Sequence, residues 1–340
     1  MVNKVFFLGA GFSKAVNDNY PLMDELTKQV FEGLEKESVR KHLDEIPEQV
    51  KQNIESLLTY LSTDFPWKTE TTKHANLALY ASIVQIISDI FTELAKQDIS
   101  KFSNLPWRSC KSFARTLRRN ASDVSIITLN YDLLLEQLMR SDYAIENKGV
   151  GFISCSFFYP YPMTSIYARS GAAILAGDPD EEQRFPHILK LHGSANWFWA
   201  GMTPSDILYY RQWHKEEPAD ITKGLVPYII PPVLDKNAFY NHIAIRSLWQ
   251  QAAQLLEKAD EIYIIGFSFP QTDLAVKYLF QSALRNSEPD IYVVNRAKED
   301  ELRSVYQDVL QGQCVNYEYI GSDNVVEQFI SKFFLTDSFQ

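Results

Sequence analysis

The sequence VFFLGAGFS, residues 5–13, decides the expected fold, because four apolar residues run directly into a turn with two closely spaced glycines. The apolar run has the length and composition of a strand that is buried on both faces of a parallel sheet. The turn into a following helix consists of Gly9, Ala10, Gly11, Phe12 and Ser13. Glycines at such a turn let the backbone approach a pyrophosphate, and N–H groups at a helix start point toward an anion. A plain strand-to-helix turn without a ligand is the alternative interpretation.

This turn departs from the fingerprint of hydride-transferring dehydrogenases. That fingerprint has a third glycine where this chain has Lys14, and an acidic residue that ends a second strand about 20 residues later. Asp24 and Glu25 come earlier than that and lie in a helical pattern. The motif therefore favours a dinucleotide site but disfavours a dehydrogenase.

Further apolar runs predict the rest of the sheet. Strands are expected at residues 4–8, 124–129, 261–265 and 290–294, with a fifth at 188–191. The first four are each followed by a predicted helix, at residues 22–36, 133–140, 274–285 and 298–310. Alternating strands and helices predict an α/β fold with a Rossmann-like parallel sheet and helices on both faces.

The connection between the first two strands is much longer than the fold requires. A crossover helix needs only about a dozen residues, whereas residues 23–119 repeat apolar positions at helical spacing. We therefore predict an inserted helical subdomain at 23–119, within a dinucleotide-binding domain formed by 1–22 and 120–340. Two aromatic-rich regions, 142–186 and 197–245, are expected to be irregular.

Composition limits the partners. Lys and Arg total 33 against 43 Asp and Glu, so the formal charge is -10. An acidic chain repels phosphate backbones, and we expect no direct nucleic-acid partner. The densest basic stretch, residues 115–119 with Lys111 nearby, has helical spacing and is interpreted as a solvated helix face rather than a binding patch.

The cysteines and apolar runs predict the compartment. Cys110, Cys155 and Cys314 lie far apart and form no CxxC pair, which fits a reducing cytoplasm. The N-terminal apolar run is too short for a signal peptide, and no run approaches the ~20 apolar residues that cross a bilayer. We expect a cytoplasmic protein with no membrane segment. No histidine pair has metal-ligand spacing, so we also expect no metal site.

Polar residues follow the second predicted strand. Thr128, Asn130 and Asp132 occupy the carboxyl end of residues 124–129, where ligands bind in open α/β sheets. The alternative is that Asn130 or Asp132 only caps the helix that begins near Leu133, since both residue types favour that position.

Three more strand ends carry candidate groups. His192 follows the 188–191 strand, and an imidazole there suits a general base near neutral pH, although a lone histidine is more often structural. The turn Gly266-Phe267-Ser268 and the strand end at Asn295 could meet the adenosine half of a dinucleotide. Either of these is alone more typical of an ordinary turn.

Taken in chain order, these motifs resemble the sirtuin (Sir2-like) superfamily. They are GAGFS at 9–13, TLNYD at 128–132, LHGS at 191–194, GFS at 266–268 and the strand end at Asn295. The resemblance covers the expected sheet domain from residue 4 to about 296, and the order of the motifs makes it specific. The inserted helices and aromatic regions carry no such motif.

The resemblance implies an enzyme that binds NAD as a substrate and cleaves its nicotinamide–ribose bond. It places residues 9–13 at the pyrophosphate, Asn130 and Asp132 beside the nicotinamide ribose, and His192 as the base near the ribose hydroxyls. It also places residues 266–268 and Asn295 at the adenosine.

Two departures refine the resemblance. Protein deacylases of the superfamily hold a zinc ribbon with four cysteines in CxxC pairs, which three scattered cysteines cannot build. Their cofactor loop resembles Gly-Ile-Pro-Asp-Phe-Arg, where this chain has Asp-Asn-Tyr-Pro-Leu at 18–22. The chain is therefore similar to the zinc-ribbon-lacking branch of bacterial antiphage defence, whose members hydrolyse NAD to nicotinamide and ADP-ribose.

The branch resemblance implies regulation by assembly. Such relatives form homo-oligomers or act beside an ATP-driven DNA translocase or an Argonaute-like protein. Two alternatives stay open: an NAD-dependent protein deacylase or ADP-ribosyltransferase, and a non-catalytic NAD or ADP-ribose sensor. Asn130 and His192 argue against the sensor, because binding alone needs no base.

Overall fold

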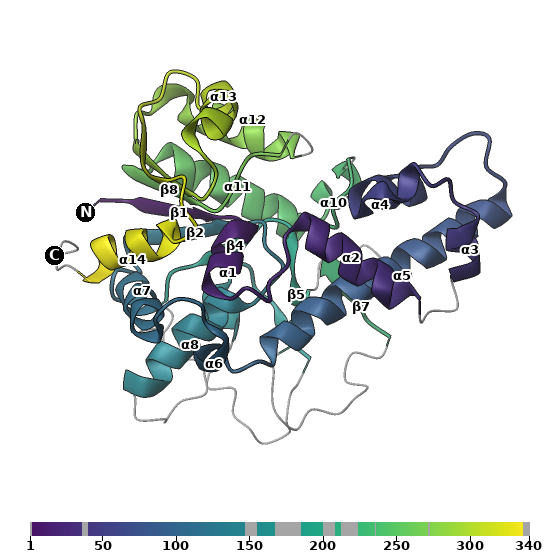
Figure 1. Ribbon diagram of the computed structural model, residues 1–340, viewed down its shortest axis with the longest axis horizontal. Coiled ribbons are helices and arrows are strands. Elements are labelled where there is room, and N and C mark those ends of the chain that lie inside the picture. The colour runs from purple at the N-terminus through teal and green to yellow at the C-terminus, as the bar shows by residue number, and fades with distance from the viewer. Residues whose placement is uncertain are drawn as a thin grey trace.

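The computed structural model describes most of the chain. The described residues are 2–35, 40–146, 155–166, 185–199, 208–211, 224–234, 236–270 and 273–335. Figure 1 shows a central sheet with helices packed on both sides and a helical extension at one end.

The central sheet has six parallel strands in the order β10-β9-β8-β1-β2-β4. The strands are β1 (Lys4–Leu8), β2 (Val124–Thr128), β4 (Ile188–Lys190), β8 (Glu261–Ile265), β9 (Asp290–Asn295) and β10 (Val315–Ile320). This confirms the predicted Rossmann-like α/β class and the five predicted strands. The sixth, β10, was missed because it is an edge strand in which polar Asn316 and Glu318 are exposed, so it has no continuous apolar run.

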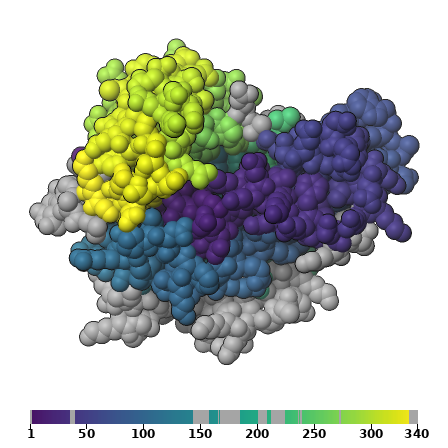
Figure 2. All heavy atoms as spheres, in the orientation of Figure 1, coloured from purple at the N-terminus to yellow at the C-terminus, as the bar shows by residue number. Residues whose placement is uncertain are grey.

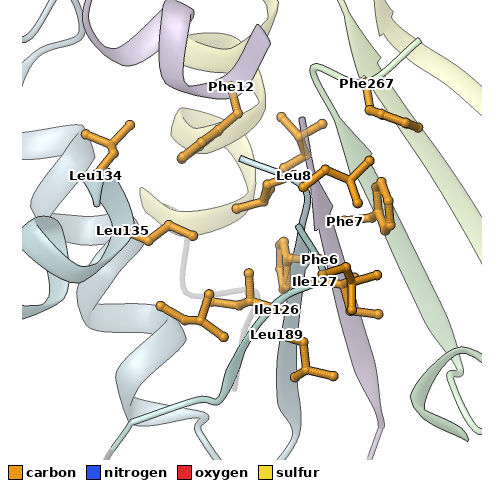
Figure 3. Close-up of a cluster of buried hydrophobic side chains, with 14 of the residues drawn as sticks. Phe6, Phe7, Leu8, Phe12, Ile126, Ile127, Leu134, Leu135, Leu189 and Phe267 are labelled. Carbon is orange, nitrogen blue, oxygen red and sulfur yellow. The ribbon is translucent and has the colours of Figure 1, made fainter. Parts of the chain in front are cut away.

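The strand β1 lies at the centre of the sheet and of the hydrophobic core (Figure 3). Alternate side chains of a strand point to opposite faces. Phe6 stacks on Tyr263 with ring centroids 4.8 Å apart and meets Phe113 edge-on at 6.3 Å. Phe7 meets Phe280 on the other face at 5.1 Å. One short strand therefore joins both helical layers to the sheet.

Helices cover both faces (Figure 1). On one side α7 packs against α8 and α14, and on the other α12 packs against α11 and α13. The helices are α1 (Ala10–Val16), α2 (Met23–Leu34), α3 (Arg40–Asp44), α4 (Ile54–Ser62), α5 (Glu70–Ala95), α6 (Ile99–Phe102), α7 (Trp107–Arg119), α8 (Leu134–Glu146), α10 (Asn237–Tyr240), α11 (Ile243–Glu257), α12 (Leu274–Ala283), α13 (Glu299–Val309) and α14 (Val325–Leu335).

The helices α2 to α5 form the extension at one end of the molecule, where α5 packs against α2, α3 and α4. By its length and composition α5 is apolar enough to cross a membrane, a property that the core helices of soluble proteins share. Its buried side chains include Leu79, Ile83 and Ile87. The 23–119 subdomain boundary stays a prediction, and α7, which lies inside it, packs on the sheet domain's α8.

The aromatic regions were wrongly expected to be irregular throughout. Described residues in and next to these regions form a second sheet in the order β3-β6-β5-β7, with β3 (Thr164–Ser165), β5 (Gly193–Trp199), β6 (Tyr209–Tyr210) and β7 (Val226–Ile229). The partners of β5 are distant in sequence, so no local hairpin signal marks them. The described remainder of these regions includes the end of α8, the helix α10 and the first residues of α11, while residues 147–154, 167–184, 200–207, 212–223 and 235 lie outside the described residues.

The basic stretch of α7 is only partly solvated. Arg115 and Arg118 reach the carboxylate of Asp142 on α8 at 3.1 and 3.2 Å, and Asp142 has no exposed side-chain surface. Two cations therefore compensate one buried charge between the helices, which argues against a ligand-binding patch at these two arginines.

Two glycine turns meet at the carboxyl ends of β1 and β8. The amide of Gly9 donates to the carbonyl of Ile265, and that of Gly11 to the carbonyl of Gly266, both at 2.9 Å. A Cβ on Gly9 would lie 2.4 Å from the Gly266 oxygen, and a Cβ on Gly266, at φ +65°, would lie 2.2 Å from the Phe12 nitrogen. The contact is backbone to backbone, which only glycine permits.

We predict that Gly266→Ala destabilises the protein by about 3 kcal/mol or more, because left-handed backbone strain adds to overlap with a backbone that cannot move aside. Gly312→Ala is the matched control, since Gly312 has φ +80° with nothing within 4 Å of an added Cβ. It should cost only about 1–2 kcal/mol. The unfolding free energy from denaturant titration measures both, and equal losses would contradict the contact.

Candidate active site

A cleft of about 1280 Å³ opens where the carboxyl ends of β1, β2, β8 and β9 meet. Its lining comes from segments far apart in sequence, including the first turn, the β2–α8 loop and the start of α14. Figure 2 shows the N-terminal residues in purple lying between the C-terminal helices in yellow and the helices of the extension in blue. This edge is where ligands bind in open α/β sheets.

Most predicted site residues line this one cleft. They are Ala10, Gly11, Ser13, Asn130, Asp132, His192, Gly266, Phe267, Ser268 and Asn295. Gly9, Phe12 and Thr128, expected to bind the cofactor, lie behind it instead. Phe12 packs against Phe113 at 5.6 Å, and the Thr128 hydroxyl donates to the Leu8 carbonyl at 2.8 Å. These three support the turn from below.

The glycine turn differs from the expected cradle of free N–H groups. The amides of Gly9 and Gly11 donate to the β8 turn, and the amide of Phe12 donates to the Gly9 carbonyl at 3.0 Å. These N–H groups are used within the protein. An anion could still meet Gly11, which has no side chain, and the positive N-terminal end of α1.

Asn130 is held against this turn by its amide nitrogen. Nδ2 donates to the Gly9 carbonyl at 3.0 Å and to Ser13 Oγ at 3.1 Å. Its backbone amide donates to Thr128 Oγ1 at 3.0 Å. Within the described structure the carboxamide oxygen has no hydrogen-bond partner, which leaves it as the atom available to a ligand.

Asp132 both caps a helix and takes part in the site. One carboxylate oxygen accepts from the Leu134 amide at 3.0 Å at the start of α8, and the other accepts from Ser13 Oγ at 2.7 Å. Burial raises the pKa of this carboxyl, while Lys190 and these hydrogen bonds oppose the rise. Helix capping therefore accounts for one of these two hydrogen bonds of Asp132, and the bond from Ser13 belongs to the site.

His192 lies at the corner between β4 and β5 and is 5% exposed. Its Nε2 is buried and has no hydrogen-bond partner among the described residues. Burial lowers the pKa of His192 to about 4; the nearby carboxylate of Asp273 opposes this and the ammonium of Lys236 adds to it. The ring is therefore neutral near pH 7, and it is a weaker base than an imidazole exposed to water.

Sequence reasoning missed the pair formed by Lys236 and Asp273. Both line the cleft, and their side chains form an ion pair. Lys236 lies in a segment without strand or helix periodicity, and its partner is 37 residues away. Asp273 had a usable signal, because an Asp directly before a helix is a favoured N-cap residue.

The helical extension supplies the remaining wall. Leu26 of α2, Glu55 of α4 and Phe91 of α5 line the same cleft. Phe91 also meets the ring of Tyr131 edge-on at 5.7 Å. Among the described residues, no group of three or more His, Cys, Asp or Glu could hold a metal ion, and the metal-free site stays a prediction.

Comparison with known proteins gives a family match. A model of the SIR2-like domain matches residues 124–311. Similar solved structures include a crystal structure of a Sir2 homologue in complex with NAD, 12% identical with a TM-score of 0.45, covering 99% of this chain and 91% of that chain. Another is Sir2 bound to acetylated peptide, 11% identical with a TM-score of 0.41, covering 99% and 94%. Comparison with curated proteins gave no match.

The burial of His192 predicts a pH-dependent stability. Between its ordinary pKa of 6.5 and about 4, the unfolded chain binds a proton here and the folded chain does not, so stability falls as the pH falls. From pH 7 to 5, wild type should lose about 2 kcal/mol more unfolding free energy than His192→Gln. Denaturant titrations at both pH values measure this, and equal losses would show that the ring is not held neutral.

Proposed function

Because this chain belongs to the SIR2-like domain family, we propose that it is an NAD+ hydrolase that releases nicotinamide and ADP-ribose. The cleft exceeds the roughly 300–1,000 Å³ usual for small-molecule sites, so it has room for a dinucleotide. Its floor is a glycine turn, and its polar groups gather at one end of the central strands.

The observation that carries the proposal is the orphaned imidazole of His192. A buried polar atom without a partner costs free energy, and Nε2 is such an atom on His192, a residue that lines the same cleft as Asn130. A substrate or water that donates a hydrogen bond to Nε2 would remove this cost. An unpartnered neutral imidazole and an available carboxamide oxygen, on residues that line one cleft, support a reaction in which a proton is removed.

The proposed chemistry uses these two groups in one step. The bond between the nicotinamide nitrogen and ribose C1′ breaks, its electron pair leaves with nicotinamide, and C1′ acquires oxocarbenium character. A water held by the Asn130 oxygen forms the new C1′–O bond. His192 Nε2 accepts the proton that the water releases. Positioning the water supplies part of the rate enhancement and proton transfer supplies another part.

Hydrolysis is favoured over transfer to a protein because the chain contains three cysteines in all. Four cysteines are needed for the zinc ribbon expected of a deacylase. The cleft wall is instead completed by α2, α4 and α5. Water is then the acceptor present at the highest concentration.

We predict that purified protein converts NAD to nicotinamide and ADP-ribose, and that Asn130→Ala and His192→Ala each lower turnover by about 100-fold or more. His74→Ala is the control, because His74 is exposed on α5. Chromatography of the products with and without an acyl-lysine peptide separates hydrolysis from deacylation. Wild-type turnover in both cleft variants would refute the assigned roles, and intact NAD with assembled protein would favour a sensor.

We further propose that the enzyme is cytoplasmic, takes part in antiviral defence and is switched on by assembly, as a homo-oligomer or with a defence partner. The extension formed by α2 to α5 supports this, because it adds surface and also lines the cleft. NAD turnover per protomer should rise with protein concentration as larger species form in light scattering. A strict monomer at high concentration would contradict self-assembly.

A further inference from the structure

A fully buried lysine lies directly before the candidate base. Lys190 on β4 is 1% exposed, and its strand neighbours Leu189 and Leu191 are 1% and 0% exposed. Moving a charge out of water into such surroundings is costly unless the charge is paired and hydrogen-bonded. The position therefore requires specific partners.

The partners of Lys190 lie on the neighbouring loop and helix. Its Nζ donates to the backbone carbonyl of Asp132 and to Glu136 Oε1, the latter at 3.1 Å. Glu136 is also buried and accepts from the hydroxyl of Tyr159 at 2.9 Å. The ammonium group thus ties β4 to the loop that joins β2 to α8.

The same loop carries Asn130. Asp132, held through its carbonyl by Lys190, accepts from Ser13 Oγ, and Ser13 Oγ accepts in turn from Asn130 Nδ2. The other end of the loop is fixed by backbone pairing, since the Leu191 amide donates to the Thr128 carbonyl at 2.9 Å. A continuous set of contacts therefore connects the residue two positions before His192 to Asn130.

Stability alone does not account for a lysine here. A buried ion pair commonly contributes no more than apolar residues of the same volume. The lysine fixes the relative position of its two acceptors, because an ammonium group donates hydrogen bonds in defined directions. An apolar side chain would leave the Asp132 carbonyl without this donor.

We propose that Lys190 is a positioning residue: it holds the 130–132 loop against β4, so that Asn130 and His192 face the cleft in a fixed relation. The kinetic part of this proposal rests on the NAD hydrolase function; the structural part does not. Lys190 does not line the cleft and acts through Asp132.

The test uses the double variant K190M/E136Q, which removes the lysine without leaving a buried carboxylate unpaired. The control is Y159F, which removes the hydrogen bonds from the Tyr159 hydroxyl to Glu136 and to Asn196 and leaves the contact between Lys190 and Asp132 intact. Two measurements are made on the full chain: hydrogen exchange of the 128–136 backbone by mass spectrometry, and kcat and KM for NAD. Exchange reports on the loop whether or not the protein hydrolyses NAD.

In K190M/E136Q, exchange over 128–136 should rise at least about fivefold above the Y159F level, as expected for a loop that opens locally. We expect kcat to fall about 100-fold with KM within about threefold, because misplaced groups slow the chemical step. Exchange and kcat at the control level would overturn the proposal. If K190M/E136Q does not fold, K190Q, whose side chain is shorter, is measured against the same two criteria. A wild type without NAD turnover would refute the proposed function, while exchange would still decide the role of Lys190.

Discussion

The structure depends on the direct contact between the turns after β1 and β8, where Gly9 and Gly11 meet Gly266 backbone to backbone. β8 pairs with β1 in register, so the turns that follow them leave the sheet at the same level. The Gly11 amide then bonds to the Gly266 carbonyl, and any Cβ at this junction would overlap backbone. This contact sets the floor of the cleft. Close packing of the two turns therefore explains why glycine is required at these positions.

Central parts of the fold were predictable because their signals are local. The run at residues 5–8 and the central residues of β2, β8 and β9 are mostly buried, so each of these strands contains a short and mainly apolar run. β10 borders only one strand and alternates polar with apolar residues. The second sheet was not predicted for another reason. Its strand β5 pairs with β6 and β7, which are not joined to it by tight turns, so no turn motif in the sequence indicates the pairing.

The site residues at the ends of predicted strands could be predicted from the sequence. The contacts between residues that are distant in sequence could not. Asn130 and His192 follow predicted strands, so their place at one sheet edge follows from topology. The use of the Gly11 amide by Gly266, and the pairing of Lys236 with Asp273, depend on residues more than 30 positions apart. Lys190 had a sequence signal that is clear only in retrospect: a charge inside a strand that is otherwise apolar must find a buried partner.

The helical extension and the site are in direct contact, because the ring of Tyr131 in the site packs against α5 of the extension. Tyr131 lies between Asn130 and Asp132, its hydroxyl donates to the Ile230 carbonyl at 2.6 Å, and its carbonyl accepts from the Ala195 amide at 2.9 Å. Its ring meets Phe91 of α5. A close-packed contact of this kind cannot be compressed without displacing one partner. A shift of α5 toward the sheet must therefore move Tyr131, and with it the loop that presents Asn130, or be resisted by the second sheet to which Tyr131 is anchored. The inserted helices therefore contact the loop that presents Asn130 through Tyr131, and they also form part of the cleft wall.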